Sequence, residues 1–132
     1  MIQIPKSIVD EIIIQALSEL PNEACGLLAG NDNVIKKKFG MINADVSPEH
    51  FTFDPSEQFK VMRAARTENL KIIANYHSHP ETPARPSIED IRLAYDENII
   101  YVIVSLAFVV PEIKAYRIRQ GEVEKIHIEI LQ

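Results

Sequence analysis

The sequence predicts one α/β (α+β) domain over residues 1–132, in which helices flank a mostly antiparallel sheet. Three observations carry this prediction. One segment has helical periodicity, several short apolar segments are separated by turn residues, and the end of the chain alternates apolar with polar side chains. The length of 132 residues, with 46% hydrophobic and 25% charged residues, suits one globular domain with a buried core.

The first third of the chain supplies one helix and two strands. Apolar side chains recur every third or fourth position over residues 6–19, which predicts an amphipathic helix. CGLLAG is short and apolar, so it is predicted to be a buried strand. The NDN that follows is a turn, and VIKKKFGMIN is the predicted return strand.

A second helix is predicted in DPSEQFKVMRAARTENL. Asp54 precedes this helix as its capping residue, and Pro55 takes the first helical position, where a missing N–H costs nothing. Glu57 stands where it completes a capping box with Asp54. Directly afterwards, KIIANY is predicted to be a strand that leads to a pair of histidines.

The last third of the chain adds a short helix, a buried strand and a hairpin. The helix is predicted over roughly residues 88–96, and IIYVIVSL is apolar nearly throughout, as in a central strand covered on both faces. EIKAYRIR and VEKIHIEIL alternate with period two around the turn QGE, which predicts a final hairpin. Four phenylalanines are assigned to the core: Phe39, Phe51, Phe53 and Phe59.

Charge and composition exclude several classes of protein. The net charge of −5 argues against a protein that binds the nucleic-acid backbone, and the single basic cluster, Lys36–Lys38, is interpreted as a solvated strand edge. No apolar run is long enough to span a membrane, and MIQIPKSIVDEIIIQ has acids inside its apolar stretch, unlike a signal peptide. One cysteine cannot form an internal disulfide, so a reducing cytoplasm is the expected location.

Two histidines after the predicted strand KIIANY are candidate metal ligands. His77 and His79 project to the same side if the backbone stays extended, and Pro80 ends the strand. Asp90, on the first turn of the predicted helix, is the nearest residue with the chemistry of a third ligand. Two imidazoles and one carboxylate leave the fourth position of a tetrahedral zinc site open, which is typical of catalytic zinc.

Hydrolysis at such a site also needs a general acid/base and a hydrogen-bond donor to the oxyanion. Glu23, at the start of a predicted buried strand, is the candidate for the first role because its carboxylate would be partly desolvated there. Ser87 is the candidate for the second role.

A simpler interpretation stays open for each of these residues. Ser87 and Asp90 match a helix-capping pair, histidine pairs in strands are often surface residues, and Glu23 alone would be a surface acid. The metal interpretation is favoured because capping does not require two histidines within the same fourteen residues. The two interpretations of Ser87 and Asp90 are compatible, since a capped helix start is a rigid place for a ligand.

Two segments resemble those of a known family. HSHPETPARPSIED has the form H-x-H-P, six residues, S-x-x-D, which is similar to the motif of the JAMM/MPN metalloproteases. PNEACGLLAG is similar to the segment that carries their catalytic glutamate, and the resemblance covers most of the chain. It implies a cytidine-deaminase-like JAB/MPN domain, with a curved, mostly antiparallel mixed sheet flanked by helices.

The same resemblance implies the roles of the site residues. His77, His79 and Asp90 would bind one Zn²⁺ per chain, Glu23 would be the general acid/base acting on the water, and Ser87 would stabilise the oxyanion.

The implied activity is that of a zinc-dependent metalloprotease or isopeptidase. It would hydrolyse the bond after the C-terminal Gly-Gly of a ubiquitin-like or sulfur-carrier protein, as in the small prokaryotic members that HSHPETPARPS most resembles. A catalytically silent protein-binding scaffold of the same fold is the alternative, and the complete ligand set disfavours it. A zinc hydrolase of an unrelated small substrate is a third hypothesis. The sequence leaves open the substrate, peptide versus isopeptide cleavage, and a homo-oligomer.

Other reactive residues receive no catalytic role. Cys25 is interpreted as a buried, inert thiol, and His127 is expected to face solvent on the last strand. His50 is interpreted as a surface residue, with a place beside the substrate groove as the alternative. Glu81 and Arg85 lie within the ligand loop and are candidates for substrate contacts.

Overall fold

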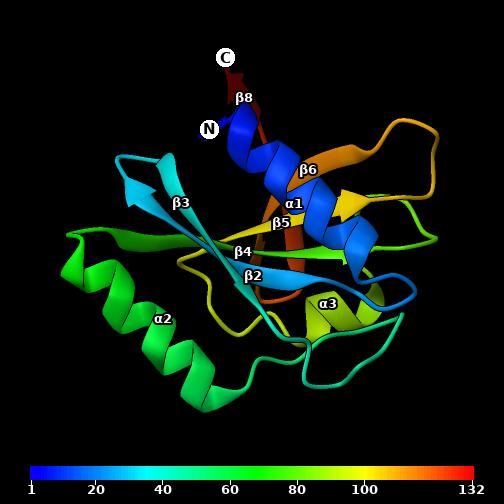
Figure 1. Ribbon diagram of the computed structural model, residues 1–132. Helices are drawn as coiled ribbons and strands as arrows, with labels where there is room; N and C mark the ends of the chain where they lie inside the picture. The colour runs from blue at the N-terminus through cyan, green and yellow to red at the C-terminus, as the bar shows by residue number, and fades with distance from the viewer.

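The computed structural model describes residues 1–132 and contains an eight-stranded mixed sheet with three helices (Figure 1). The strand order is β7-β6-β5-β4-β2-β3-β1-β8. This curved α/β sheet confirms the predicted fold class. The elements, in chain order, are β1 (Ile2–Pro5), α1 (Lys6–Ser18), β2 (Cys25–Asn31), β3 (Val34–Met41), α2 (Pro55–Thr67), β4 (Lys71–His79), α3 (Ile88–Arg92), β5 (Ile100–Ser105), β6 (Glu112–Arg119), β7 (Glu122–Ile126) and β8 (Ile128–Leu131).

The end of the chain divides between the two edges of the sheet. β7 pairs with β6, but β8 pairs in parallel with β1, with Ile2 opposite Ile128. Only His127 separates the two strands, and its carbonyl accepts a hydrogen bond from the Ile2 N–H (3.0 Å). The prediction of one strand over residues 123–131 is therefore wrong, because the alternation of side chains does not reveal which strand is the partner. β1 itself was not predicted from the sequence.

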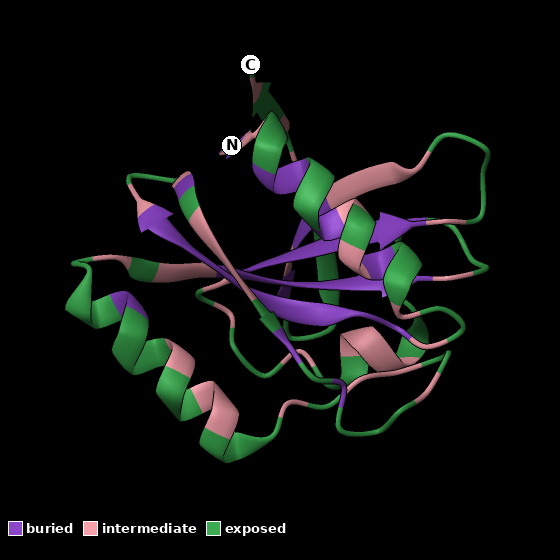
Figure 2. Cartoon of the chain, viewed as in Figure 1, coloured by how far each residue is buried: buried purple, intermediate pink, exposed green.

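One face of the sheet packs on α1 and carries the main core (Figure 2). Alternation along β4 turns Ala74 and Tyr76 toward this face and turns Asn75, His77 and His79 toward the opposite one. The predicted helix over residues 6–19 is confirmed as α1. The buried residues of this core are Ile2, Ile4, Ile8, Val9, Ile12, Leu28, Ile35, Ala74, Tyr76, Ile100, Val102, Val104 and Ala115.

The opposite face of the sheet carries two smaller clusters. One lies under the loop before α3 and contains Ala84, Tyr101, Ile103, Tyr116 and Ile118. The other contains Cys25, Leu27 and Met41, with Phe51, Phe53, Val61 and Ile72 packed against it. The two histidines at the end of β4 face the same side of the sheet as these clusters.

Only one of the two hydrogen bonds of the predicted capping box forms at the start of α2. Asp54 accepts a hydrogen bond from the Glu57 N–H (3.0 Å), but the Glu57 carboxylate does not return the bond. Its Oε1 instead accepts from the N–H of Ile42 (3.0 Å), beyond the end of β3, so the predicted capping box is wrong. The helix is largely exposed, and Phe59 is 61% exposed rather than part of the core.

The α3 helix is shorter than predicted and ends at Arg92 instead of residue 96. The N–H groups of Ala94 and Tyr95 bond to carbonyls only two or three residues back, which tightens the chain out of the helix. Asp96 then forms a turn, because its side chain accepts from the N–H of Asn98 (2.8 Å).

The lysine cluster lies on β3. This strand pairs with β1 at one position only, where Gln3 lies opposite Val34. The rest of the outer edge of β3 has no partner strand, so Lys36–Lys38 do lie on an open strand edge. Only Lys36 is exposed, because the half-buried Lys37 and Lys38 contact Glu68 and Gln15. None of the three helices is long and apolar enough to cross a membrane.

Candidate metal centre and active site

The end of β4 places the two predicted histidine ligands. β4 continues to His79, and Pro80 follows it directly. His77 lies between Cys25 of β2 and Ile103 of β5, so strands on both sides fix its backbone. The two histidines are buried, with exposed fractions of 2% and 4%. Their imidazoles therefore stand on backbone that paired strands hold in place.

The capping box of α3 places the third predicted ligand. The N–H of Asp90 donates to Ser87 Oγ (3.0 Å), and the N–H of Ser87 donates to Asp90 Oδ2 (2.9 Å). The same Oδ2 lies 3.2 Å from His77 Nε2 and 3.1 Å from His79 Nε2. The capping interpretation of Ser87 and Asp90 is confirmed, and it is compatible with the ligand interpretation because the capping contact aims the carboxylate at the histidines.

The three ligand atoms fit a metal ion. The two Nε2 atoms are 3.1 Å apart, so the triangle that they form with Asp90 Oδ2 is nearly equilateral. Tetrahedral zinc with bonds of about 2.0–2.1 Å requires ligand atoms about 3.3 Å apart. His79 Nδ1 contacts the carbonyl of Pro83 (2.9 Å), which favours the tautomer that leaves Nε2 free to ligate.

The electrostatics of the cluster also suit a cation. Burial lowers the pKa of His77, which favours the neutral imidazole that a metal needs. Burial alone would raise the pKa of Asp90, but the contacts with His77 and His79 outweigh it and hold the pKa below its usual range. The cluster therefore presents the Nε2 atoms of His77 and His79 and one carboxylate oxygen of Asp90 to a common point.

Glu23 lies immediately before β2, at the edge of the same site. The Ala24 N–H donates to Ser78 Oγ (2.8 Å) and the Ser78 N–H donates to the Ala24 carbonyl (3.0 Å), which ties this segment to the histidine strand. Glu23 is 2% exposed, and its Oε1 has no hydrogen-bond partner. Burial, together with the negative charges of Asp90, Glu89 and Glu49, raises the pKa of Glu23 to about 9.

A buried asparagine that sequence reasoning missed holds the Glu23 backbone in place. Asn43 Nδ2 donates to the carbonyls of Glu23 (3.1 Å) and His50 (3.0 Å), and its Oδ1 accepts from the N–H of Asp45 (3.0 Å) and Thr52 (3.3 Å). Asn43 thereby joins the loop after β3 to the start of β2. No local pattern in the sequence marks this residue, since its partners are defined only by the fold.

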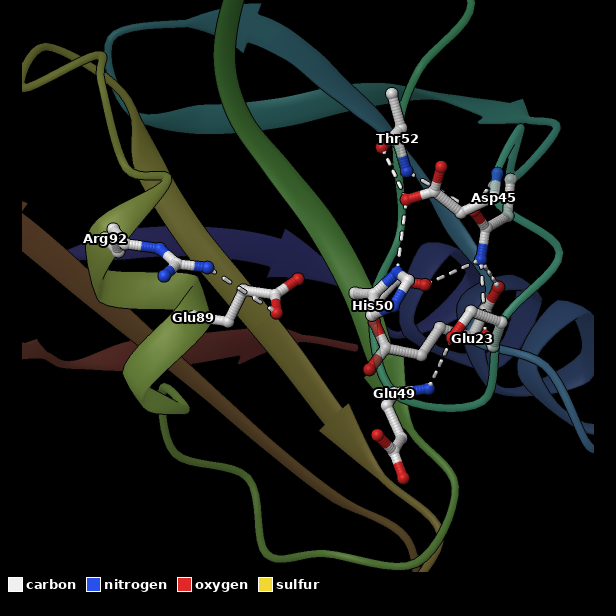
Figure 3. Close-up of polar contacts among 9 residues, drawn as sticks. Glu23, Asp45, Glu49, His50, Thr52, Glu89 and Arg92 are labelled. Carbon is white, nitrogen blue, oxygen red and sulfur yellow. Dashed lines mark hydrogen bonds and ion pairs between the residues drawn. The ribbon is translucent and has the colours of Figure 1, made fainter.

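Two further residues of this loop border the candidate metal ligands. The Phe51 ring stacks on the His77 ring, with centroids 4.7 Å apart, so Phe51 supports the ligand as well as the small core. His50 Nδ1 lies 3.1 Å from Asp45 Oδ2, which also accepts from Thr52 Oγ1 (2.6 Å). Figure 3 shows His50, Glu23 and Glu49 near one another, and Glu89 on α3 across β4 from them. Of the two interpretations of His50, the structure favours the place beside the groove.

The site opens into a cavity of about 890 Å³. The cavity residues are Leu20, Pro21, Glu23, Pro48, Glu49, His50, His79, Pro80, Glu81, Thr82, Ser87, Ile88 and Glu89. Glu81 therefore lines the cavity as expected of a substrate contact, whereas Arg85 does not. Cys25 is fully buried, as predicted, and burial raises the pKa of its thiol to about 12. His127 is exposed, as predicted.

Comparison with known proteins gives relatives of similar length. The chain is 34% identical over 130 residues to the CysO-cysteine peptidase of Mycobacterium tuberculosis, covering 95% of this chain and 88% of the relative. It is 34% identical over 117 residues to the probable TtuB-protein conjugate cleaving protease of Thermus thermophilus, covering 85% and 78%. It is 33% identical over 93 residues to the desampylase of Pyrococcus furiosus, covering 70% and 66%.

Solved structures agree with the sequence relatives. A protein from Desulfitobacterium hafniense superposes with a TM-score of 0.93 at 39% identity, covering 100% of this chain and 94% of that one. A structure described as a JAMM metalloprotease-like zinc site superposes with a TM-score of 0.66 at 23% identity, covering 100% and 99%, and shows the shared fold. The family model described as prokaryotic homologs of the JAB domain matches residues 5–119. The chain belongs to this prokaryotic JAB-domain family of JAMM/MPN proteins.

Proposed function

We propose that this chain is a zinc-dependent metalloprotease or isopeptidase that acts on conjugates of a ubiquitin-like or sulfur-carrier protein. One observation carries the proposal: three ligand atoms converge within 3.1–3.2 Å of one another beside a buried carboxyl group that has an unpartnered oxygen. His77, His79 and Asp90 would hold one Zn²⁺, with Glu23 and Ser87 beside it in the cavity.

The substrate class is supported by the names of the relatives. Those relatives are named for cleaving CysO-cysteine and TtuB conjugates and for desampylation, and the proposal extends that class to this chain. A carrier tail would enter the cavity in an extended form, and glycines would be favoured where side chains have no room. We propose that cleavage follows the Gly-Gly end of such a tail, in the cytoplasm.

Glu23 would move the protons of the reaction. A bound zinc ion supplies Lewis acidity, which polarises the substrate carbonyl and acidifies a water molecule. Glu23 would take a proton from the attacking water and deliver it to the leaving amine. Its buried position and its unpartnered oxygen at the cavity support the role, because that oxygen is free to accept and return a proton.

Ser87 would donate a hydrogen bond to the oxygen of the substrate carbonyl as negative charge develops there. Its Oγ accepts the bond from the Asp90 N–H through a lone pair, so the hydroxyl hydrogen remains available. Ser87 is exposed and lines the cavity, which supports this second role.

Metal content with matched variants tests the ligand set. His77→Ala and His79→Ala are expected to lose stoichiometric zinc, whereas His127→Ala, at an exposed position on the far end of the sheet, should bind it like the unaltered chain. Zinc retained by both ligand variants would contradict the site. Glu23→Gln should keep zinc and lose most turnover of a carrier conjugate, with Glu124→Gln on β7 as its control.

The same assay separates the enzyme from the scaffold alternative. A zinc-loaded chain that binds a carrier conjugate without hydrolysing it would favour the scaffold. Hydrolysis that depends on Glu23 supports the enzyme.

A further inference from the structure

The charged residues that line the cavity beside the candidate metal ligands are almost all acidic. Four glutamates line it, and no lysine or arginine does; they are Glu23, Glu49, Glu81 and Glu89. Glu23 is buried with an unpartnered oxygen, so at least one of these acids belongs to a built site rather than to a solvated surface. Together with Asp90, the site holds five carboxyl groups. With a divalent cation bound and a proton on Glu23, the site would still carry a net negative charge.

The nearest arginines do not neutralise this charge. Arg85 is exposed and does not line the cavity, although it belongs to the ligand loop. Arg92 approaches Glu89 at 3.9 Å, but its side chain is 72% exposed, so the pair is loose and screened by water. The loop over residues 42–54, which walls the other side, has no lysine or arginine. The cavity therefore offers no lysine or arginine to a bound carboxylate, and the His50 that lines it already contacts Asp45.

The negative charge of the cavity acts on the leaving group, which is the amine released from the carrier. In either kind of conjugate, water adds its oxygen to the carrier carbonyl carbon, the carbon–nitrogen bond breaks, and a proton goes to the departing nitrogen. A free amino acid released in this way carries its α-carboxylate on the carbon next to that nitrogen. A lysine side chain released from an isopeptide bond carries only methylenes there, and its amine becomes cationic.

We propose, on the basis of the proposed function, that this site selects amine leaving groups without an adjacent carboxylate. Its preferred substrates are then isopeptides to lysine side chains rather than carriers that end in a free amino acid. The exposed apolar side chains of Leu20 and Ile88 at the cavity wall suit lysine methylenes. Like charges separated by several ångströms at a hydrated surface repel enough to change a rate about tenfold.

Three conjugates of one carrier test the selection. The carrier is TtuB, joined through its C-terminal carbonyl to the lysine side chain of a short capped peptide, to alanine, or to alanine amide. The last two differ only in the charge of the leaving group. We expect kcat/KM of the zinc-loaded chain to be about tenfold higher for alanine amide than for alanine, and highest for the lysine conjugate. The ratio should shrink as salt is added.

Variants of the cavity acids show whether these residues cause the preference. The triple variant Glu49→Gln, Glu81→Gln, Glu89→Gln is expected to bring the amide-to-carboxylate ratio close to one. The control triple variant Glu11→Gln, Glu122→Gln, Glu124→Gln changes the net charge equally but lies on α1 and β7, and it should keep the ratio. An unchanged ratio in the cavity variant would overturn the assignment.

The outcomes distinguish this inference from the function on which it rests. Equal or faster cleavage of the alanine conjugate would overturn the selection alone and leave the hydrolase in place. No cleavage of any of the three conjugates by the zinc-loaded chain would overturn the proposed function, and the selection with it.

Discussion

Asp90 Oδ2 accepts the backbone N–H of Ser87 at 2.9 Å while it lies 3.1–3.2 Å from the two histidine nitrogens. One oxygen atom therefore serves both the start of α3 and the candidate metal centre. A helix of five residues is too short to be stable by itself, so the capping contact is what orients the carboxylate. Changes at Ser87 should consequently affect the metal site even though Ser87 is not a proposed ligand.

Ser87→Ala should affect stability and activity to different extents. Loss of the capping acceptor is expected to cost about 1 kcal/mol of unfolding free energy. Loss of the proposed oxyanion donor is expected to lower kcat by about 10²-fold or more. Ser87→Thr keeps a hydroxyl and is the control. Urea denaturation and steady-state hydrolysis of a carrier conjugate measure the two effects, and an unchanged kcat in the alanine variant would exclude the oxyanion role.

The pH dependence of the metal-free chain tests the buried state of Glu23. The pKa of Glu23 is about 9 in the folded chain against an ordinary value of 4.5, so folding favours the protonated carboxyl. Its contribution to stability is therefore lost as the pH rises from about 4.5 toward 9. With a chelator present, Glu23→Gln should become more stable than the unaltered chain, on the order of a few kcal/mol by pH 8. Equal denaturant midpoints at pH 5 and pH 8 would contradict this, with Glu124→Gln as the control.

The two buried asparagines near the site should respond in opposite ways to the same substitution. Asn43 bonds to several backbone groups, so Asn43→Leu is expected to cost about 2–4 kcal/mol and to lower activity by releasing Glu23. Asn75 is 9% exposed and its Oδ1 has no partner, so Asn75→Leu is expected to stabilise the fold by about 1 kcal/mol. Chemical denaturation of both variants checks the contrast, and a loss of stability in both would refute it.

Zinc should stabilise the folded chain in a pH-dependent way. A ligand that binds only the folded state at 100 times its Kd adds about 2.7 kcal/mol to the unfolding free energy. The thermal shift should disappear in acid, because protonated imidazoles cannot ligate. His79→Ala is expected to abolish the shift at neutral pH, and His127→Ala to preserve it. Differential scanning fluorimetry with and without a chelator measures this, and a shift that persists in the ligand variant would point to another site.

The local parts of the site were predictable from the sequence. His77, His79, Ser87 and Asp90 lie within one strand–loop–helix segment, so their spacing fixes their relative positions once the loop is held. Glu23 was chosen for its place at the start of a predicted buried strand, and the family resemblance implied the same role. Its closeness to the histidines could not be derived from periodicity, because it depends on the pairing of β2 with β4.

The residues that support the site were not predictable in the same way. Asn43 and Phe51 follow β3 in a segment without regular structure. Asn43 reaches Glu23, just before β2, and Phe51 reaches His77 on β4. Their roles depend on pairings that a single sequence does not encode in its periodicity. The same limit explains β8, whose side-chain alternation continues that of β7 while its partner changes from β6 to β1.

The pairing of β1 with β8 has a consequence for the order in which the chain folds. The side chains of Gln3 and Glu129 are hydrogen-bonded although 126 positions separate them in sequence. A ribosome releases β1 long before β8 exists. Because β1 pairs with β3 at one position only, most of its pairing must wait for the last residues to be synthesised. The strands that carry the histidines lie earlier in the chain and can associate first. β8 therefore completes the sheet last, after the strands around the candidate site have paired.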